Sequence, residues 1–255
     1  MKALGVIPAR YKSSRFPGKP LVRIAGKTMI ERVYRRAGQA SLLNELLVAT
    51  DDSRIADCVR SFGGKVMMTD ENCPTGTERV ALVAAASPGY DIVLNIQGDE
   101  PLLEPENVDT AIRLFNRRPD ADITTLVRPV RMSEEADDPN CVKVVMGEED
   151  RALYFSRGKA PWVGRAGEDW LAAEKGREAH VIHIGLYAYW VESLLKLVRW
   201  PVALCERMEG LEQLRALANG QKIYAARLEG TLSIGVDVPE DVTRVEEMLR
   251  RLGLD

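Results

Sequence analysis

The first half of the chain alternates short apolar runs with segments whose apolar residues recur every three or four positions. The runs predict strands, and the periodic segments predict amphipathic helices. Four strand–helix pairs follow one another: Ala3 to Ala9 then Met29 to Ala40, Glu45 to Thr50 then Arg54 to Phe62, Lys65 to Thr69 then Thr77 to Ala86, and Asp91 to Gln97 then Pro105 to Asn116. Successive β–α units specify an α/β fold, a doubly wound and mostly parallel sheet with helices on both faces.

From about residue 120 the pattern changes to strands that follow one another without a helix between several of them. The predicted strands are Ile123 to Val130, Val142 to Met146, Ala152 to Ser156, His183 to Trp190 and Lys222 to Leu228. This arrangement is typical of a smaller mixed sheet with antiparallel pairs. The polar, glycine-containing residues 163–178 predict a loop or a short exposed helix. Two helices are also predicted in this half, Glu206 to Ala218 before the last of these strands and Pro239 to Leu252 after it.

The composition changes this picture little, since 45% hydrophobic and 29% charged residues are typical of a globular protein. No linker of biased composition interrupts the chain. We therefore expect one cooperative domain over residues 1–255, with one part at about 1–120 and a second at about 121–255.

The charge distribution excludes some classes of partner. A net charge of −3 gives the whole molecule no basis for wrapping nucleic acid. The four cysteines are far apart and form no C-x-x-C pair, so free thiols are expected rather than a zinc or redox site. The apolar run at the start is too short for a signal peptide, and no run of about 18 apolar residues suggests a membrane span. We expect a cytoplasmic protein.

Positive charge is concentrated in residues 1–30, which contain seven cationic side chains and no carboxylate. The segment "IPARYKSSRFPGKP" at 7–20 follows the first predicted strand, at the edge of the sheet where ligands of open α/β sheets bind. Backbone N–H groups near Gly18, together with Arg10, Arg15 and Lys19, would form a cationic pocket suited to a polyphosphate. The alternative is a solvated turn. "AGKT" at 25–28 resembles the end of a Walker A loop, but Leu21 stands where its first glycine should be.

Two aspartates also follow apolar stretches. Asp99 ends "LNIQGD" and Asp237 lies in "SIGVDVPED", before a helix that begins near a proline. Mg²⁺ binds through one or two carboxylates plus phosphate oxygens, so the pair fits a metal site beside a triphosphate. Taken singly, each aspartate could instead be a helix cap or a turn residue.

Three other motifs contain residue types that could carry chemistry. In "TGTERV" at 75–80 the threonines are explained by helix capping, whereas Arg79 contacts a ligand or is exposed. The histidines of "HVIH", 180 and 183, point to opposite faces of a strand, which argues against a paired metal site and leaves His183 as a hydrogen-bonding group. Ser13 and Ser14 have no histidine nearby in sequence, so a Ser-His-Asp mechanism is not expected.

Nine blocks in order give the chain a resemblance over nearly its whole length to the 3-deoxy-manno-octulosonate cytidylyltransferase family, also called CMP-Kdo synthetases. The blocks are "IPARYKSSRFPGKPL" (7–21), "VATDD" (48–52), "TGTERV" (75–80), "NIQGDEPLL" (95–103), "DPNCVKVV" (138–145), "ALYFSR" (152–157), "HIGLYAY" (183–189), "LEQLRAL" (211–217) and "GVDVPED" (235–241). The resemblance implies that CTP and Kdo, a sugar acid of lipopolysaccharide, give CMP-Kdo and pyrophosphate with Mg²⁺ on a nucleotidyltransferase fold.

The resemblance also implies roles for individual residues. By this resemblance, Arg10, Ser14 and Lys19 would contact the phosphates, and Arg79 and Gln97 would contact the rest of the nucleotide. Asp99 and Asp237 would bind the metal ion. The catalytic residues would be Arg10, Lys19, Asp99 and Asp237. The sugar-acid pocket would be lined by Arg157, His183, Tyr187, Glu212 and Gln213. Residues 1–120 would then form the nucleotide-binding part, and residues 121–255 the sugar-binding and dimerisation part of a homodimer.

Two alternatives remain at this point. A related cytidylyltransferase would act on sialic acid or on an amino analogue of Kdo. "GTER" and "HIGLYAY" favour the Kdo branch. A non-catalytic nucleotide-binding module would use the same fold but would be expected to lack one of the two carboxylates, and both Asp99 and Asp237 are present.

Overall fold

The computed structural model describes residues 1–12, 16–165, 167–168, 179–230 and 235–254. These residues form two compact units, each assembled from separate stretches of the chain. The first unit comprises residues 1–112, 186–198 and 232–255, and the second comprises residues 113–185 and 199–231. Asp237 therefore belongs with the first strands of the chain, although more than 130 positions separate it from Asp99.

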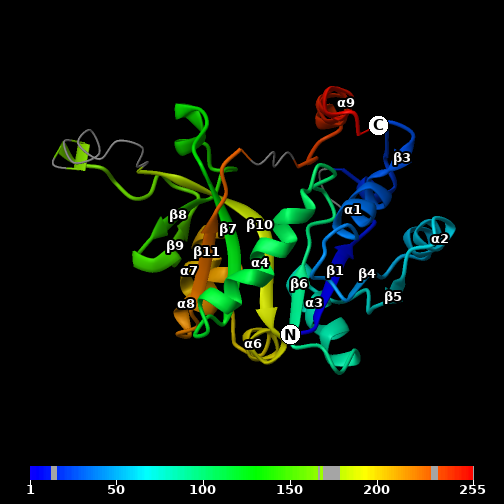
Figure 1. The fold of residues 1–255 in the computed structure, drawn as a ribbon, viewed down its shortest axis with the longest axis horizontal. Helices are drawn as coiled ribbons and strands as arrows, with labels where there is room; N and C mark the ends of the chain where they lie inside the picture. Colours follow the sequence, from blue (N-terminus) through cyan, green and yellow to red (C-terminus); the bar gives the residue numbers. More distant parts are fainter. Residues whose placement is uncertain (13–15, 166, 169–178, 231–234, 255) are drawn as a thin grey trace. The chain divides into compact units, whose positions relative to one another are not determined.

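The sheet of the first unit is built on β1 (Ala3–Ala9), which lies between β4 (Glu45–Thr50) and β6 (Ile92–Asn95) and is parallel to both (Figure 1). The short β5 (Val66–Met68) extends this parallel set beyond β4. On the other side, residues 187–190 of β10 (Val181–Trp190) pair antiparallel with β6. The near-continuous burial of these strands agrees with a sheet covered on both faces.

The helices of the first half begin where their capping residues predict. Thr28 caps α1 (Met29–Ala37), Asp52 caps α2 (Ser53–Ser61), and Thr75 forms a capping box with Glu78 at α3 (Gly76–Ala86). The remaining helices that contribute to this unit are α4 (Pro105–Arg117), α6 (Val191–Leu197) and α9 (Glu240–Leu252). The four predicted strand–helix pairs are thus confirmed. No helix in the described ranges has the length and apolar character needed to cross a membrane.

A small hairpin was not predicted from the sequence. Strands β2 (Arg23–Ile24) and β3 (Lys27–Thr28) follow the 3-10 turn η1 (Lys19–Leu21). The end of the chain packs against this hairpin, where the backbone N–H of Ala25 donates to Glu246 of α9 at 2.7 Å. A shared apolar cluster joins these segments, made of Ile24, Met29, Leu102, Val236, Val245 and Leu249. This cluster anchors the segment that precedes α9 and contains Asp237.

The strands of the second unit run in mixed directions, as their pattern predicts, but they belong to the one nine-stranded sheet that also contains β1 and do not form a separate, smaller sheet. These strands are β7 (Ile123–Pro129), β8 (Lys143–Met146), β9 (Arg151–Ser156) and β11 (Ile223–Arg227), joined by the first residues of β10. β7 and β11 are parallel, whereas β9 is antiparallel to both β11 and β8. Two 3-10 segments complete the unit, η2 (Ser133–Ala136) and η3 (Glu148–Asp150).

The helix predicted over Glu206 to Ala218 is wrong as a single element. The structure has two helices there, α7 (Leu204–Glu209) and α8 (Gln213–Ala218). Gly210 ends α7 in the left-handed conformation, with φ of 65°, which glycine adopts without the steric cost of a Cβ atom. Most of the other exposed segment predicted in this half, residues 163–178, lies outside the described residues.

A buried ion pair fixes α7 against α8. The Arg215 guanidinium donates to both carboxylate oxygens of Glu206, at 2.6 and 2.9 Å, and both side chains are less than a tenth exposed. We expect Glu206→Gln to lower the free energy of unfolding by about 3–5 kcal/mol, because it leaves a buried guanidinium without its counter-charge. Urea denaturation would measure this loss. Asp120→Asn, at the exposed pair with Lys222, should leave the free energy nearly unchanged.

Candidate active site

The basic segment after β1 turns sharply at Gly18. The N–H of Gly18 donates to the carbonyl of Tyr11 at 2.9 Å, and Gly18 has φ of 73°. A Cβ atom at this position would lie 3.2 Å from the Tyr11 ring, so both the backbone conformation and the space require glycine. The turn leads directly into η1, which begins at Lys19. Ser14, predicted to contact phosphates, lies outside the described residues.

Lys19 is the residue on which the two predicted metal-binding carboxylates converge. Its Nζ lies 2.7 Å from Oδ2 of Asp99 and 3.4 Å from Oδ1 of Asp237. The lysine side chain is 15% exposed, whereas the carboxylates are 34% and 53% exposed, so this charged cluster is open to solvent mainly on its acidic side. The structure therefore brings Lys19, Asp99 and Asp237 together as predicted.

Backbone contacts hold Asp237 beside Asp99. The N–H of Val236 donates to the carbonyl of Asp99 at 2.9 Å, so the two acidic segments are joined directly. Asp241, in the first turn of α9, accepts from the N–H groups of Asp237 and Val238 at 2.8 and 3.1 Å. These bonds fix the main chain on both sides of the carboxylate, which is the condition for a preorganised ion site.

The pair of carboxylates suits a magnesium ion. Two carboxylates that share one ammonium group are close enough to share a divalent cation, which prefers such hard oxygen ligands. No group of three or more His, Cys, Asp or Glu side chains able to hold a metal occurs among the residues that the structure describes. A magnesium ion here would therefore take its other ligands from water and from a bound phosphate.

Beside this cluster, the Glu100 carboxyl has a raised pKa. Burial raises the pKa of the Glu100 carboxyl to about 7, and the neighbouring charge of Asp99 adds to the effect.

Arg79 is fully buried rather than exposed on its helix. Its Nη1 donates to the Thr69 hydroxyl, and its Nη2 lies 3.4 Å from Oδ2 of Asp51. Among the residues that the structure describes, its Nε and Nη2 have no hydrogen-bond partner, and neither does Oδ1 of Asp51. Buried polar groups in proteins are nearly always satisfied, so these groups are suited to hydrogen bonding with a bound ligand or with water.

Arg10, Arg79 and Cys73 lie close to one another. A guanidinium N–H of Arg10 donates to the carbonyl of Cys73. Burial raises the pKa of the Cys73 thiol, and the positive charges of Arg79 and Arg10 oppose this effect. Arg10, which follows β1, and Arg79, which lies in α3, thus both approach Cys73.

Close backbone contacts at the end of β1 align this edge. A Cβ atom on Gly98 would lie 3.2 Å from the carbonyl oxygen of Pro8, and one on Gly76 would lie 3.5 Å from the Pro8 ring. Pro8 is therefore packed between the start of α3 and the turn after β6. This packing places the half-buried Gln97 on the segment that joins β6 to Asp99.

Arg157, predicted to bind the sugar acid, is held in the second unit. Its backbone N–H donates to the carboxylate of Glu209 at 2.8 Å, and its Nε donates to the backbone carbonyl of Glu209, also at 2.8 Å. Its Nη1 donates to the carbonyl of Pro139 at 3.0 Å. Neither Glu209 nor Lys143, whose Nζ donates to the carbonyl of Arg157 at 2.7 Å, is among the predicted site residues. The "DPNCVKVV" block was a signal for Lys143, whereas only the fold reveals Glu209.

The other predicted sugar-binding residues are divided between the units. His183 lies in the second unit, and its Nε2 is 2.9 Å from the Thr125 hydroxyl. The Phe155 ring meets the imidazole edge-to-face, with 5.3 Å between the ring centroids. Glu212 and Gln213 stand at the start of α8 in the same unit. Tyr187 belongs to the first unit, where it is buried and pairs with Asn95 of β6.

His183 should remain neutral throughout the physiological pH range. Burial lowers the pKa of its imidazole to about 3, well below the ordinary value of about 6.5. Below pH 6.5 the unfolded chain binds a proton that the folded protein does not, so this residue makes stability fall as the pH falls toward 3. We expect the ring-proton NMR signal that disappears in His183→Gln to show no titration between pH 8 and 5. A midpoint near 6.5 would contradict this prediction.

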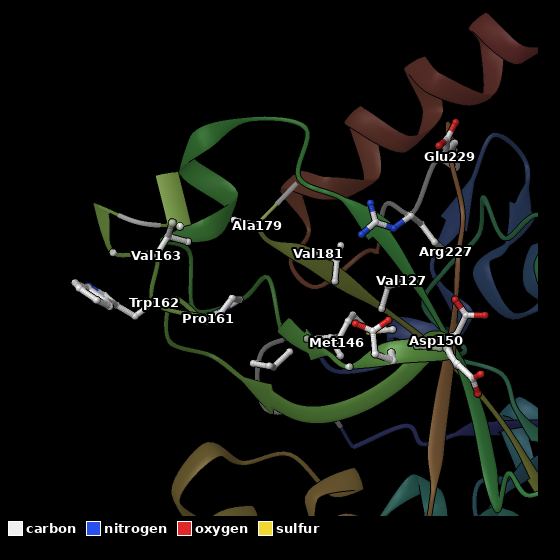
Figure 2. A pocket seen from close by; sticks show the side chains of 18 of the residues that line it. Val127, Met146, Asp150, Pro161, Trp162, Val163, Ala179, Val181, Arg227 and Glu229 are labelled. Atoms are coloured by element: carbon white, nitrogen blue, oxygen red, sulfur yellow. The ribbon is translucent and has the colours of Figure 1, made fainter. Parts of the chain in front are cut away.

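A separate cavity of about 1170 Å³ lies in the second unit. Figure 2 shows that its labelled lining includes Met146 and Asp150 near one end and Pro161 and Val163 near the other. Trp162 contributes to the rim with a side chain that is 87% exposed. None of the predicted site residues lines this cavity, so the predicted chemistry lies elsewhere.

Comparisons with known proteins agree with these observations. The model of the cytidylyltransferase family matches residues 4–223. The 3-deoxy-manno-octulosonate cytidylyltransferase of Syntrophotalea carbinolica is 48% identical, over 99% of this chain and all of that protein. The enzyme of the same name from Protochlamydia amoebophila is 42% identical, over 96% of this chain and 93% of that protein. The solved structure of a CMP:2-keto-3-deoxy-manno-octonic acid synthetase complexed with CTP is similar to this chain, with a TM-score of 0.90 and 38% sequence identity. The similarity covers 99% of this chain and all of that one.

Proposed function

The chain belongs to the 3-deoxy-manno-octulosonate cytidylyltransferase family, and from this membership we propose how its residues carry out the reaction. The enzyme transfers CMP from CTP to the anomeric hydroxyl of Kdo and gives CMP-Kdo and pyrophosphate for lipopolysaccharide biosynthesis. The resemblances do not favour a sialic acid or an amino analogue of Kdo as the sugar. The observation that supports our assignment of residues is the contact of one ammonium group, that of Lys19, with both Asp99 and Asp237.

In this proposal the edge of the sheet at the end of β1 binds CTP. Lys19, Arg10 and Ser14 would hold the phosphates, since the first two are cations at the turn after β1. Arg79 and Gln97 would contact the rest of the nucleotide. The unsatisfied Nε and Nη2 of the buried Arg79 support this role, because an acceptor on the ligand would remove the cost of leaving them unpaired.

Asp99 and Asp237 would hold Mg²⁺. The ion would neutralise negative charge on the triphosphate and on the departing pyrophosphate. The chain itself supplies the two fixed carboxylates, whose main chain is held by Val236 and Asp241. With a metal bound, Lys19 would be released from the carboxylates to contact the phosphates.

The chemical step needs no nucleophile from the protein. The anomeric oxygen of Kdo forms a bond to the α-phosphorus, and the bond from that phosphorus to the pyrophosphate oxygen breaks in line. The hydroxyl proton passes to solvent. Lys19 and Arg10 would stabilise the charge that grows on the leaving pyrophosphate, so positioning and electrostatics supply most of the catalysis.

The sugar acid would bind to residues that come mainly from the second unit. Arg157 would pair with its carboxylate, because a guanidinium matches a carboxylate with two parallel hydrogen bonds. His183, as a neutral ring, would exchange hydrogen bonds with hydroxyl groups, as would Tyr187, Glu212 and Gln213. We also propose a doubly wound sheet, a cytoplasmic location and a homodimer that uses the second part of the chain and the β10 region.

A pyrophosphate-release assay tests the proposal. We expect release only when CTP, Kdo and Mg²⁺ are all present, and little release when N-acetylneuraminate replaces Kdo. Equal or faster release with N-acetylneuraminate would overturn the sugar assignment. Full activity in the presence of excess chelator would overturn the role of the metal.

A further inference from the structure

Lys143 is the one lysine among the largest fully buried side chains that the structure describes. It is the first residue of β8, between Ser156 of β9 and Ile182 of β10. Its Nζ donates to the carbonyl oxygens of Asp138 and Arg157, both at 2.7 Å. The established chemistry of the reaction assigns this lysine no role, so its complete burial requires an explanation.

The buried ammonium has only neutral groups as its direct partners. Within the described ranges, no carboxylate lies within ion-pair distance of Lys143. Burial lowers the pKa of this lysine, and the more distant acidic groups Asp137, Asp138, Glu209 and Cys141 oppose the shift. A buried cation without a close anion is costly. The cost is reduced when an anion binds nearby.

Arg157 is the point at which such an anion is expected. Glu209 holds its N–H and its Nε, Pro139 holds its Nη1, and Lys143 holds its carbonyl. Its Nη2 contacts no acceptor among the residues that the structure describes. Four of its polar groups are thus fixed by the protein, and the edge of the guanidinium that carries Nη2 is left for a ligand.

The surrounding contacts form one connected support. Oε1 of Glu209 accepts from the Ser156 hydroxyl at 2.8 Å while Oε2 accepts from Arg157. The Asp138–Pro139–Asn140 turn is closed by Asp138, which accepts from the N–H of Asn140 at 2.8 Å. The same turn supplies the carbonyls that receive Lys143 and Arg157. The "DPNCVKVV" block therefore builds the support of Arg157.

We propose that Lys143 and Glu209 are positioning residues that fix Arg157 for an anionic sugar acid, and that the charge of Lys143 strengthens binding of that anion. The inference rests on the proposed role of Arg157 in binding the carboxylate of Kdo. Both residues act through Arg157 and belong to the second unit, whereas the residues proposed to bind the nucleotide belong to the first. Their loss should therefore change the use of Kdo and spare the use of CTP.

The experiment measures kcat and KM for each substrate by pyrophosphate release. We expect Lys143→Met and Glu209→Gln to lower kcat/KM for Kdo by about 10- to 100-fold, because a small displacement of a positioning group has effects of this size. The KM for CTP should change by less than about twofold. Lys159→Met is the matched control, since this nearby exposed lysine pairs, among the described carboxylates, with the exposed Asp137 alone, at 3.1 Å. It should leave both substrates unaffected.

A double-mutant cycle distinguishes positioning from general damage. In an Arg157→Ala background, adding Lys143→Met should not lower kcat/KM for Kdo further, because the residue through which it acts is already absent. A further tenfold loss in the double variant would overturn the inference. If Lys143→Met does not fold, as judged by circular dichroism, the isosteric Glu209→Gln carries the same test.

The outcomes separate this inference from the proposed function. If Arg157→Ala leaves KM for Kdo unchanged while the reaction proceeds, the proposed role of Arg157 is wrong. If Arg157→Ala impairs the use of Kdo but Lys143→Met and Glu209→Gln do not, only the positioning inference fails. Equal losses for Kdo and CTP in the two positioning variants would also overturn it.

Discussion

Replacing Asp99 by asparagine should reduce turnover by about 10³-fold or more while the protein remains folded. The substitution removes one of the two carboxylates that converge on a single cation position, and electrostatic stabilisation of the leaving group depends on that position. The fold should survive, because the contact of Asp99 with Val236 uses its backbone carbonyl and not its side chain. Steady-state pyrophosphate release, with circular dichroism as a check on folding, measures the effect.

A matched control for Asp99→Asn is Asp57→Asn in the same unit. Asp57 is 73% exposed and pairs with Arg60 within α2, so its replacement should leave turnover unchanged. The Mg²⁺ concentration that gives half-maximal activity should rise in Asp99→Asn and stay constant in the control. Parent-like turnover in Asp99→Asn would contradict metal-dependent catalysis at this site.

Replacing Lys19 by methionine should have the second large effect. We expect kcat/KM for CTP to fall by about 10²- to 10³-fold, because the variant loses a preorganised cation at the leaving phosphates. It should also leave Asp99 and Asp237 without the ammonium group that lies between them. Like charges that lose their shared counter-ion repel each other, so we expect the folded variant to bind Mg²⁺ more readily than the parent does.

Thermal unfolding with and without Mg²⁺ distinguishes these two effects of Lys19→Met. A cation that binds only the folded state raises the melting temperature, and the rise should be larger in Lys19→Met than in the parent. Lys65→Met is the control, because Lys65 is an exposed lysine that bonds only to Glu45 among described carboxylates. An equal Mg²⁺ response in parent and variant would show that Lys19 does not share a position with the metal.

Much of the first unit could be predicted because its signals are local. The apolar run Ala3–Ala9 and the capping residues Thr28 and Asp52 act within a few positions of the chain, so they define strand and helix independently of distant contacts. The break between α7 and α8 was missed for the opposite reason. The apolar period continues across Gly210, and the bend depends on the left-handed glycine and on the Glu206–Arg215 pair, which form together.

The candidate site shows the same division. Strand ends in a parallel sheet meet at one edge, so a cationic turn after the first strand and an aspartate after the fourth could be expected there. The complete burial of Arg79 could not be predicted, because a ligand contact and simple exposure explained an arginine at this position equally well. The support of Arg157 by Glu209 was also beyond reach, since 52 positions separate the two residues.

By itself, the sequence determined the chemical groups of this protein and the elements that carry them. Residue order decides which cations follow β1 and which carboxylates precede α9, because secondary structure responds to neighbours along the chain. Only the tertiary structure decided which of these charged groups contact one another. The antiparallel pairing of β10 with β6, the return of residues 232–255 to the first unit and the burial of Lys143 arise from packing between distant segments. Such packing depends on the whole folded chain and leaves no local pattern in the sequence.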